Sequence, residues 1–152
     1  MDRLEFSQIR RHLGKTQREM AQLLGTSHKA IQSFEQGWRT IPAHSERQIL
    51  FLLALKHAAN RKMRPCWAIK RCDPEMRKKC PAWEFQAGRF CWFINGTICR
   101  GKARKNWHSK MEICRTCKVY VDAFRVKAQP PRGTVPSAAS PSDVARGDER
   151  VT

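Results

Sequence analysis

The amino-acid sequence predicts a mainly α-helical protein in two parts: an N-terminal bundle of four or five helices, then a small loop-rich module that holds a cysteine cluster. The first 60 residues show helical spacing of apolar side chains and contain no cysteine, whereas all seven cysteines lie between residues 66 and 117. Beyond residue 127 the chain is rich in Pro, Ser, Ala and Gly and has no aromatic residue, which favours disorder. We therefore expect a bundle over residues 1–60, a cysteine module over 66–120 and a disordered tail over 128–152.

The first two helices are marked by an apolar stripe and a capping signal. Phe6, Ile9 and Leu13 recur at helical spacing near the N-terminus. Thr16 and Glu19 fit a capping box, in which each side chain accepts from the other residue's backbone N–H, so the second helix should begin directly after Thr16. Its inner face carries Met20, Ala21 and Leu24.

A Gly-Thr-Ser connection separates the second helix from a third. Its glycine suits the left-handed conformation that ends a helix, and Ser27 can cap the next helix, which buries Ile31 and Phe34. A second glycine ends that helix. Further on, Ser45 and Gln48 fit another capping box, and the apolar run 49–55 predicts a well-buried closing helix.

The short connection makes the third helix cross the second at a steep angle, which is a helix-turn-helix arrangement. This arrangement sets one helix outward at a width that fits the DNA major groove. His28, Lys29, Gln32 and Ser33 would then present hydrogen-bond donors and acceptors to base edges. The alternative is an ordinary helical bundle in which these residues form a solvated face.

The stretch LGKTQREMAQLLGTSHKAIQSFEQGWRTIP resembles the helix-turn-helix of Cro/C1-type (XRE-family) regulators of phages and bacteria, over about residues 4–57. The matching parts are T-Q-x-x-x-A, G-T-S, A-I-x-x-[FW]-E-x-G and the proline that follows. The resemblance implies a sequence-specific, DNA-binding transcriptional regulator. It also implies that Arg10 on the first helix pairs with Glu35 and braces the recognition helix.

The resemblance assigns DNA contacts to particular positions. Gln17 would hydrogen-bond a phosphate, and Arg39 and Thr40 would meet the backbone from the loop after the third helix. Trp38 and Arg39 depart from the pattern because they make this loop bulkier than usual, and we expect them to pack either on the bundle or at a dimer contact. The expected DNA-binding residues are Lys15, Gln17, Ser27, His28, Lys29, Gln32, Ser33, Arg39 and Thr40.

The charge balance favours a polyanionic partner. The chain carries 30 basic and 13 acidic residues, a formal net charge of +17, and the excess belongs to residues 1–127 because the tail is neutral overall. We expect double-stranded DNA as the partner, bound by a homodimer whose recognition helices are about 34 Å apart. Phosphate contacts by Lys15, Lys29 and Arg39 should make the affinity depend on salt.

The cysteines predict a metal or iron–sulfur site. Only Cys114 and Cys117 have the two-residue gap that lets both sulfurs reach one metal from a tight turn, and His108 can supplement the thiols. Zinc and an iron–sulfur cluster each need about four ligands, so the sequence leaves both open. The alternative is that some cysteines are small buried hydrophobic residues. The candidate ligands are Cys66, Cys72, Cys80, Cys91, Cys99, Cys114 and Cys117.

The segment CWAIKRC…CPAW…AGRFCWFINGTIC…CRTCKVY resembles the bacterial two-CW cysteine-rich module over about residues 66–120. The shared parts are C-W-x-x-x-x-C, C-P-A, G-R-x-C-W, G-T-x-C and C-x-x-C-x-[VF]-Y. Such modules occur beside sensory and signalling domains, which implies a sensing or ligand-binding role. Ala68 departs from the Glu that often follows C-W.

These features together predict a DNA-binding regulator whose cysteine module binds a metal or iron–sulfur cluster and senses redox state. Two alternatives stay open: a regulator with a purely structural zinc module, and a protein-interaction adaptor that does not bind DNA. No nucleophile–base pair, phosphate loop or paired carboxylates stand out, so we do not expect an enzyme. Because the sequence shows no leader peptide and no apolar stretch of roughly 20 residues, we expect a cytoplasmic protein that does not bind membranes.

Overall fold

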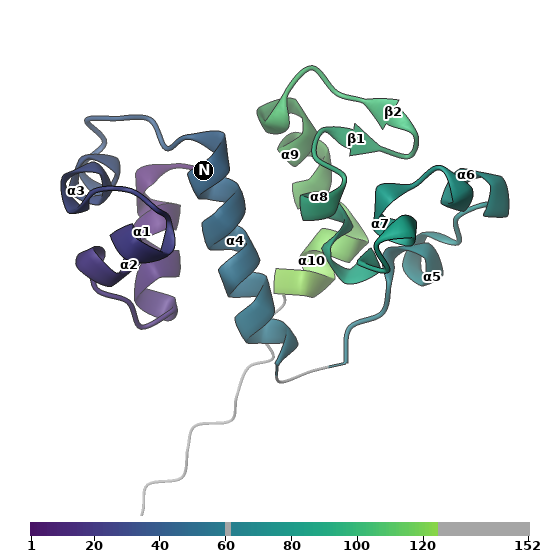
Figure 1. The fold of residues 1–152 in the computed structure, drawn as a ribbon, viewed down its shortest axis with the longest axis horizontal. Coiled ribbons are helices and arrows are strands. Elements are labelled where there is room, and N and C mark those ends of the chain that lie inside the picture. Colours follow the sequence, from purple (N-terminus) through teal and green to yellow (C-terminus); the bar gives the residue numbers. More distant parts are fainter. Residues whose placement is uncertain (60–61, 125–152) are drawn as a thin grey trace, which may run out of the picture.

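A computed structural model describes residues 1–59 and 62–124, and it confirms the prediction of a mainly α-helical protein. The described residues form ten α-helices, one 3₁₀ helix and one two-stranded antiparallel hairpin. Figure 1 shows the helices in two groups, one on each side of the long helix α4 (Ala43–Ala58).

The N-terminal group is a four-helix bundle. Its helices are α1 (Arg3–His12), α2 (Gln17–Leu23), α3 (His28–Gln36) and α4. Phe6, Met20, Ile31 and Ile49 are fully buried at its centre. Because α3 packs against both α1 and α2, its inner side is fixed by the bundle and its outer side faces solvent.

The capping signals predicted for α2 and α3 are confirmed. Thr16 Oγ1 accepts from the backbone N–H of Glu19 at 3.2 Å, and the Glu19 carboxylate accepts from the backbone N–H of Thr16 at 2.7 Å. Ser27 Oγ accepts from the first turn of α3 at 3.1 Å. Gly25 and Gly37 adopt the left-handed conformation, with φ of 61° and 80°, where α2 and α3 end.

The capping box predicted at Ser45 and Gln48 is wrong. α4 begins earlier, at Ala43, with Pro42 at its N-cap, where the fixed φ of proline suits a helix start. The Ser45 hydroxyl is fully buried and has no hydrogen-bond partner among the described residues. Gln48 donates instead to the backbone carbonyl of Leu23. Packing of this first turn on the bundle therefore outweighs the local capping signal.

The cysteine half consists of short helices rather than the loops that we expected. Asp73 and Asn106 cap two of these helices, and prolines follow Asp73 and Cys80 at first helical positions. The elements are α5 (Cys66–Lys70), α6 (Pro74–Lys78), α7 (Pro81–Glu84), η1 (Gly88–Phe90), α8 (Cys91–Ile94), β1 (Ile98–Cys99), β2 (Lys102–Ala103), α9 (Trp107–Arg115) and α10 (Lys118–Phe124).

A two-residue turn joins β1 to β2. Arg100 and Gly101 both have positive φ, 51° and 71°, which is the pattern of a type I′ turn and matches the twist of a hairpin. The register pairs Cys99 with Lys102. The turn therefore fixes Cys99 at the end of a short, regular element.

Helix α4 connects the two halves because it is apolar on more than one side. It contacts α1 on one side and α10 on the other (Figure 1). Phe51 stacks on Phe93 with ring centroids 4.5 Å apart and meets Phe90 edge-on at 5.3 Å. The guanidinium of Arg47 lies 5.1 Å from the Phe93 ring. One continuous buried cluster thus extends from the bundle into the cysteine half.

The folded part extends slightly beyond the expected module end at residue 120. α10 continues to Phe124 because Tyr120 and Phe124 pack on the Trp92 ring, at centroid distances of 5.6 and 5.5 Å. The expected tail, residues 128–152, lies outside the described residues. None of the described helices combines the length and the apolar character needed to cross a bilayer.

Candidate nucleic-acid interface and cysteine pocket

The outer side of α3 offers polar side chains to solvent. Lys29 is exposed, and His28 and Gln32 are half-buried beside it. Ser33 differs from the expectation: it is only 9% exposed, and its hydroxyl donates to the carbonyl of Lys29 at 2.9 Å. Because Ser33 turns back onto its own helix, the accessible set is His28, Lys29 and Gln32.

A largely buried ion pair holds α3 against α1. Arg10 Nε and Nη2 donate to the two carboxylate oxygens of Glu35 at 2.6 and 3.1 Å, which confirms the predicted brace. Gln17 Nε2 donates to the same carboxylate at 2.7 Å. Burial acts to raise the pKa of Glu35, but the hydrogen bonds from Arg10 and Gln17 outweigh burial and hold the pKa below its ordinary value of 4.5. One carboxylate therefore ties α1, α2 and α3 together.

This network changes the role of Gln17. We expected its side chain to bind a phosphate, whereas its amide nitrogen is already engaged by Glu35. Lys15 is half-buried next to the same network, and its backbone carbonyl accepts from Arg10 Nη1 at 2.6 Å. Ser27 is exposed and uses its hydroxyl as the N-cap of α3.

The loop after α3 is open to solvent. Arg39 and Thr40 are exposed, as a contact with the DNA backbone requires. Trp38 is 77% exposed, so this ring does not pack on the bundle. A large aromatic ring beside an arginine is a surface that favours contact with another macromolecule.

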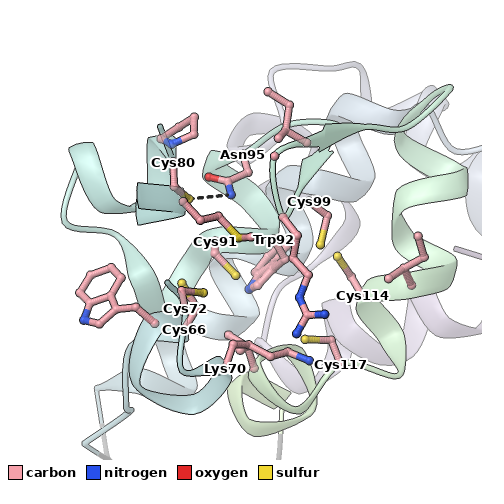
Figure 2. A pocket seen from close by; sticks show the side chains of 18 of the residues that line it. Cys66, Lys70, Cys72, Cys80, Cys91, Trp92, Asn95, Cys99, Cys114 and Cys117 are labelled. Carbon is pink, nitrogen blue, oxygen red and sulfur yellow. Dashed lines mark hydrogen bonds between the residues drawn. The ribbon is translucent and has the colours of Figure 1, made fainter. Parts of the chain in front are cut away.

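All seven cysteines line one pocket of about 330 Å³ in the second half. All seven are free thiols. Figure 2 shows the sulfur atoms of Cys99, Cys114 and Cys117 on one side and those of Cys66, Cys72 and Cys91 on the other, with Trp92 between them. The short helices and the hairpin thus bring distant cysteines to a common space.

Aromatic and basic side chains complete the pocket wall. Trp67 and Trp83 meet edge-to-face with ring centroids 4.8 Å apart, and Arg77 lies 5.4 Å from the Trp83 ring. Asn95 holds Cys80 at the edge: its amide nitrogen donates to the Cys80 sulfur at 3.4 Å, and its oxygen accepts from the backbone N–H of Ala82 at 2.8 Å. The Asn-Gly-Thr turn at residues 95–97 therefore helps to position Cys80 at the edge of the pocket.

The thiols differ in acidity because of burial and mutual contact. Cys66 and Cys91 hydrogen-bond to each other, which lowers the pKa of Cys66 and raises that of Cys91, so Cys66 ionises first. Burial raises the pKa of Cys114 to about 11, although the nearby Lys110 opposes this. Burial and mutual contact therefore make Cys66 more acidic than Cys91 and Cys114.

Lys110 is a buried cation in the pocket wall. The residue is 1% exposed, and its Nζ donates to the backbone carbonyls of Trp92 and Gly96 at 3.0 and 2.6 Å. Among the described residues no carboxylate forms an ion pair with it. Burial lowers the pKa of Lys110, and the Cys114 thiol is the largest influence that opposes this shift.

The donor set suits a metal that prefers sulfur. Seven thiols line the pocket and no carboxylate does, and soft thiolates select zinc, copper(I) or iron–sulfur clusters. His108 is not a pocket residue: its side chain is 80% exposed and lies 3.5 Å from Glu112. No three His, Cys, Asp or Glu side chains of the described residues already stand in a metal-holding arrangement. Binding therefore requires cysteine side chains to turn toward one centre, as occurs when metal binding is coupled to folding.

An arginine next to the pocket reaches the N-terminal bundle. Arg115 directly follows Cys114 at the end of α9, and its Nη1 and Nη2 donate to the Glu5 carboxylate of α1 at 2.8 and 3.0 Å. Arg115 also lies 3.6 Å from Glu46 of α4. The pocket wall is thus connected to two helices of the bundle.

Sequence reasoning missed Lys110 and Arg115. A signal for Lys110 was present, because it falls on the same face of α9 as Trp107, Met111 and Cys114, where a lysine is unusual. Arg115 carries no such signal, since its partner Glu5 lies 110 positions away in the chain. Comparison with protein-family models, curated proteins and solved structures gave no match.

Proposed function

We propose that the chain is a transcriptional regulator that binds specific double-stranded DNA through α3 and holds a zinc ion or iron–sulfur cluster in its cysteine pocket. The observation that carries this proposal is the Glu35 carboxylate, which fixes α3 to α1 and α2 while the outer side of α3 stays accessible. Readout in the major groove needs such a rigidly positioned helix with free hydrogen-bonding side chains.

The accessible residues of α3 and of the loop after it differ in the part of the DNA that each can contact. Gln32 can make a bidentate contact with adenine, which contributes about 1–3 kcal/mol of discrimination against other bases. Lys29 and Arg39 are exposed cations that suit phosphates, so their contribution is sequence-independent and falls as salt rises. His28, at the start of α3, lies where side chains of a recognition helix enter the groove.

The small size of the bundle supports a homodimer. One recognition helix covers only one half-site, so we propose two copies on a two-fold-related site with centres about 34 Å apart. The exposed Trp38 ring is the aromatic anchor that a contact between copies would use.

The proposed test joins DNA binding to the cysteine pocket in one variant. Cys114 and Cys117 are both replaced with Ser, and the full chain is purified without air alongside the wild type. Elemental analysis measures zinc and iron, and the visible spectrum separates a coloured cluster from colourless zinc. We expect lower metal content and altered DNA affinity in the variant. Metal content and DNA affinity that both match the wild type would contradict the proposal.

The continuous core favours a second candidate, in which the metal is a permanent structural zinc. α4 contributes to both halves, so a metal that stabilises the cysteine half also stabilises the bundle. In that case chelation should lower the unfolding temperature of the whole chain. DNA affinity would then change only to the extent that the protein unfolds.

A further inference from the structure

We propose that the centre held in the cysteine pocket is anionic, with Lys110 as its buried countercharge and the Trp92 indole N–H as a hydrogen-bond donor to a ligand sulfur. This inference rests on the proposed metal centre and specifies its charge and its surroundings. The shared chemistry is a metal bound by several thiolates, whether zinc or an iron–sulfur cluster.

The first observation is the incomplete pairing of Lys110. An ammonium group has three N–H donors, and two of them go to the backbone carbonyls of Trp92 and Gly96. Its residue is 1% exposed, and a buried charge without a counterion costs several kcal/mol. Since no carboxylate lines the pocket, thiolates are the anionic groups in its wall that can balance the charge of Lys110.

The second observation is independent of the first. Trp92 is 1% exposed and lines the same pocket, and its Nε1 has no hydrogen-bond partner among the described residues. Figure 2 shows its ring among the cysteine sulfurs. A buried N–H without an acceptor is costly and needs an explanation. Thiolate sulfur bound to a metal is an acceptor that fits this position, because such sulfurs take hydrogen bonds from surrounding N–H groups.

The surroundings of Lys110 also indicate which cysteines lie nearest the centre. The thiols that interact electrostatically with Lys110 are those of Cys91, Cys99 and Cys114. They come from α8, the hairpin and α9, so one centre would join three elements of the cysteine half. A centre with four thiolate ligands and a divalent metal has a net charge of about −2, which one lysine partly neutralises.

The test separates the effect of the Lys110 charge on metal binding from the effect of its hydrogen bonds. Lys110→Gln keeps donors for the two carbonyls but removes the charge, and Lys110→Met removes both. Lys79→Gln is the matched control, because Lys79 lines the same pocket but is exposed to solvent, which screens its charge. The full chain of each variant is titrated with Co²⁺, whose thiolate bonds absorb visible light, and then with competing Zn²⁺.

We expect Lys110→Gln and Lys110→Met to weaken metal affinity by about 10- to 100-fold, and Lys79→Gln to leave it unchanged. Trp92→Phe removes the indole N–H, together with part of the ring, but keeps an aromatic side chain, and it should shift the absorption of the bound Co²⁺. If a cluster can be assembled in the wild type, Lys110→Gln should make its reduction potential more negative, because the lysine stabilises the more anionic reduced form.

Two results would overturn the inference, and they are distinguishable. If Lys110→Gln binds metal like the wild type, the lysine only satisfies two carbonyls, and the proposed metal centre stands without it. If the wild type binds neither Co²⁺ nor a cluster, the proposed metal centre fails and the inference fails with it.

Discussion

Glu35 shows how one side chain can fix the position of a helix and of its exposed side. Its carboxylate accepts three hydrogen bonds, two from Arg10 and one from Gln17, so three helices share one acceptor. Hydrogen bonds to charged groups contribute about 1.5–3 kcal/mol each. We therefore expect Glu35→Gln to lower the free energy of unfolding at neutral pH by at least about 2 kcal/mol, measured by urea unfolding.

The free energy of unfolding that Glu35→Gln loses should be smaller in acid than at neutral pH. The pKa of Glu35 is lower in the folded protein than the ordinary value of 4.5, so its stabilisation is fully present above that value. It is lost as the pH falls through the folded pKa. The stability difference between wild type and Glu35→Gln should therefore shrink in acid, whereas the exposed control Glu84→Gln should show little difference at any pH. A difference that stays constant in acid would argue against the brace.

Gly88 controls how closely the pocket wall packs. A Cβ at this position would clash with a Trp67 ring carbon and would lie 2.8 Å from the Pro65 Cβ. Gly88→Ala should therefore displace the Trp67 ring and destabilise the chain by about 1–3 kcal/mol. Thermal unfolding measures the loss. Adding Trp67→Leu should recover part of it, because the smaller side chain frees the space, and simple addition of the two losses would contradict this explanation.

At the scale of one element, we expect different side chains of α3 to serve base recognition and phosphate binding. We expect Gln32→Ala to reduce discrimination between specific and random duplexes by about 1–3 kcal/mol. Lys29→Ala should weaken binding to all duplexes alike and reduce the salt slope by about 1. Fluorescence anisotropy at several salt concentrations measures both quantities.

The control for these variants is Gln22→Ala on α2, an exposed glutamine outside the outer side of α3. It should leave affinity and salt dependence unchanged. Equal effects of Gln22→Ala and Gln32→Ala would show that α3 has no special part in DNA binding.

The elements of the bundle could be predicted from the sequence because their signals are local. The caps at Thr16 and Ser27 and the left-handed Gly37 act within one turn, and the structure contains each of them. The start of α4 was misjudged because burial of Ser45 depends on the packing of distant helices. Local patterns decide the helix ends only where tertiary packing does not compete with them.

For the cysteine half, the gathering of the cysteines could be predicted from the sequence, but their geometry could not. The number of cysteines indicated a shared site, and all seven do line one pocket. The short helices were missed because segments of four or five residues are too brief to show a period. The roles that we propose for Lys110 and Trp92 depend on the groups that lie beside them in three dimensions, and spacing along the chain does not reveal those groups.

At the scale of the whole molecule, the contact of Arg115 with Glu5 joins the wall of the cysteine pocket to the bundle and so offers a route between them. We expect Arg115→Gln to leave metal affinity and the DNA affinity of the metal-loaded protein unchanged. The change in DNA affinity on metal removal should become smaller, since couplings between sites typically amount to 5- to 150-fold. The Arg115–Glu5 pair is partly exposed and contributes about 1 kcal/mol at most, so the variant should fold.

The comparison is made by titrating DNA with the metal-loaded and the metal-free forms of the wild type and of Arg115→Gln. Arg89→Gln, an exposed arginine of η1, serves as the control and should keep the wild-type ratio of affinities. An unchanged ratio in Arg115→Gln would show that the pocket acts on the bundle through α4 or not at all.

The most direct measurement is the selection of duplexes from a random pool by the full chain, followed by competition of the selected duplex against random DNA. Binding through the outer side of α3 predicts an enriched sequence whose affinity exceeds that of random duplex, and an advantage that Gln32→Ala reduces. If no duplex outcompetes random DNA, the proposed role of α3 in sequence-specific recognition is contradicted.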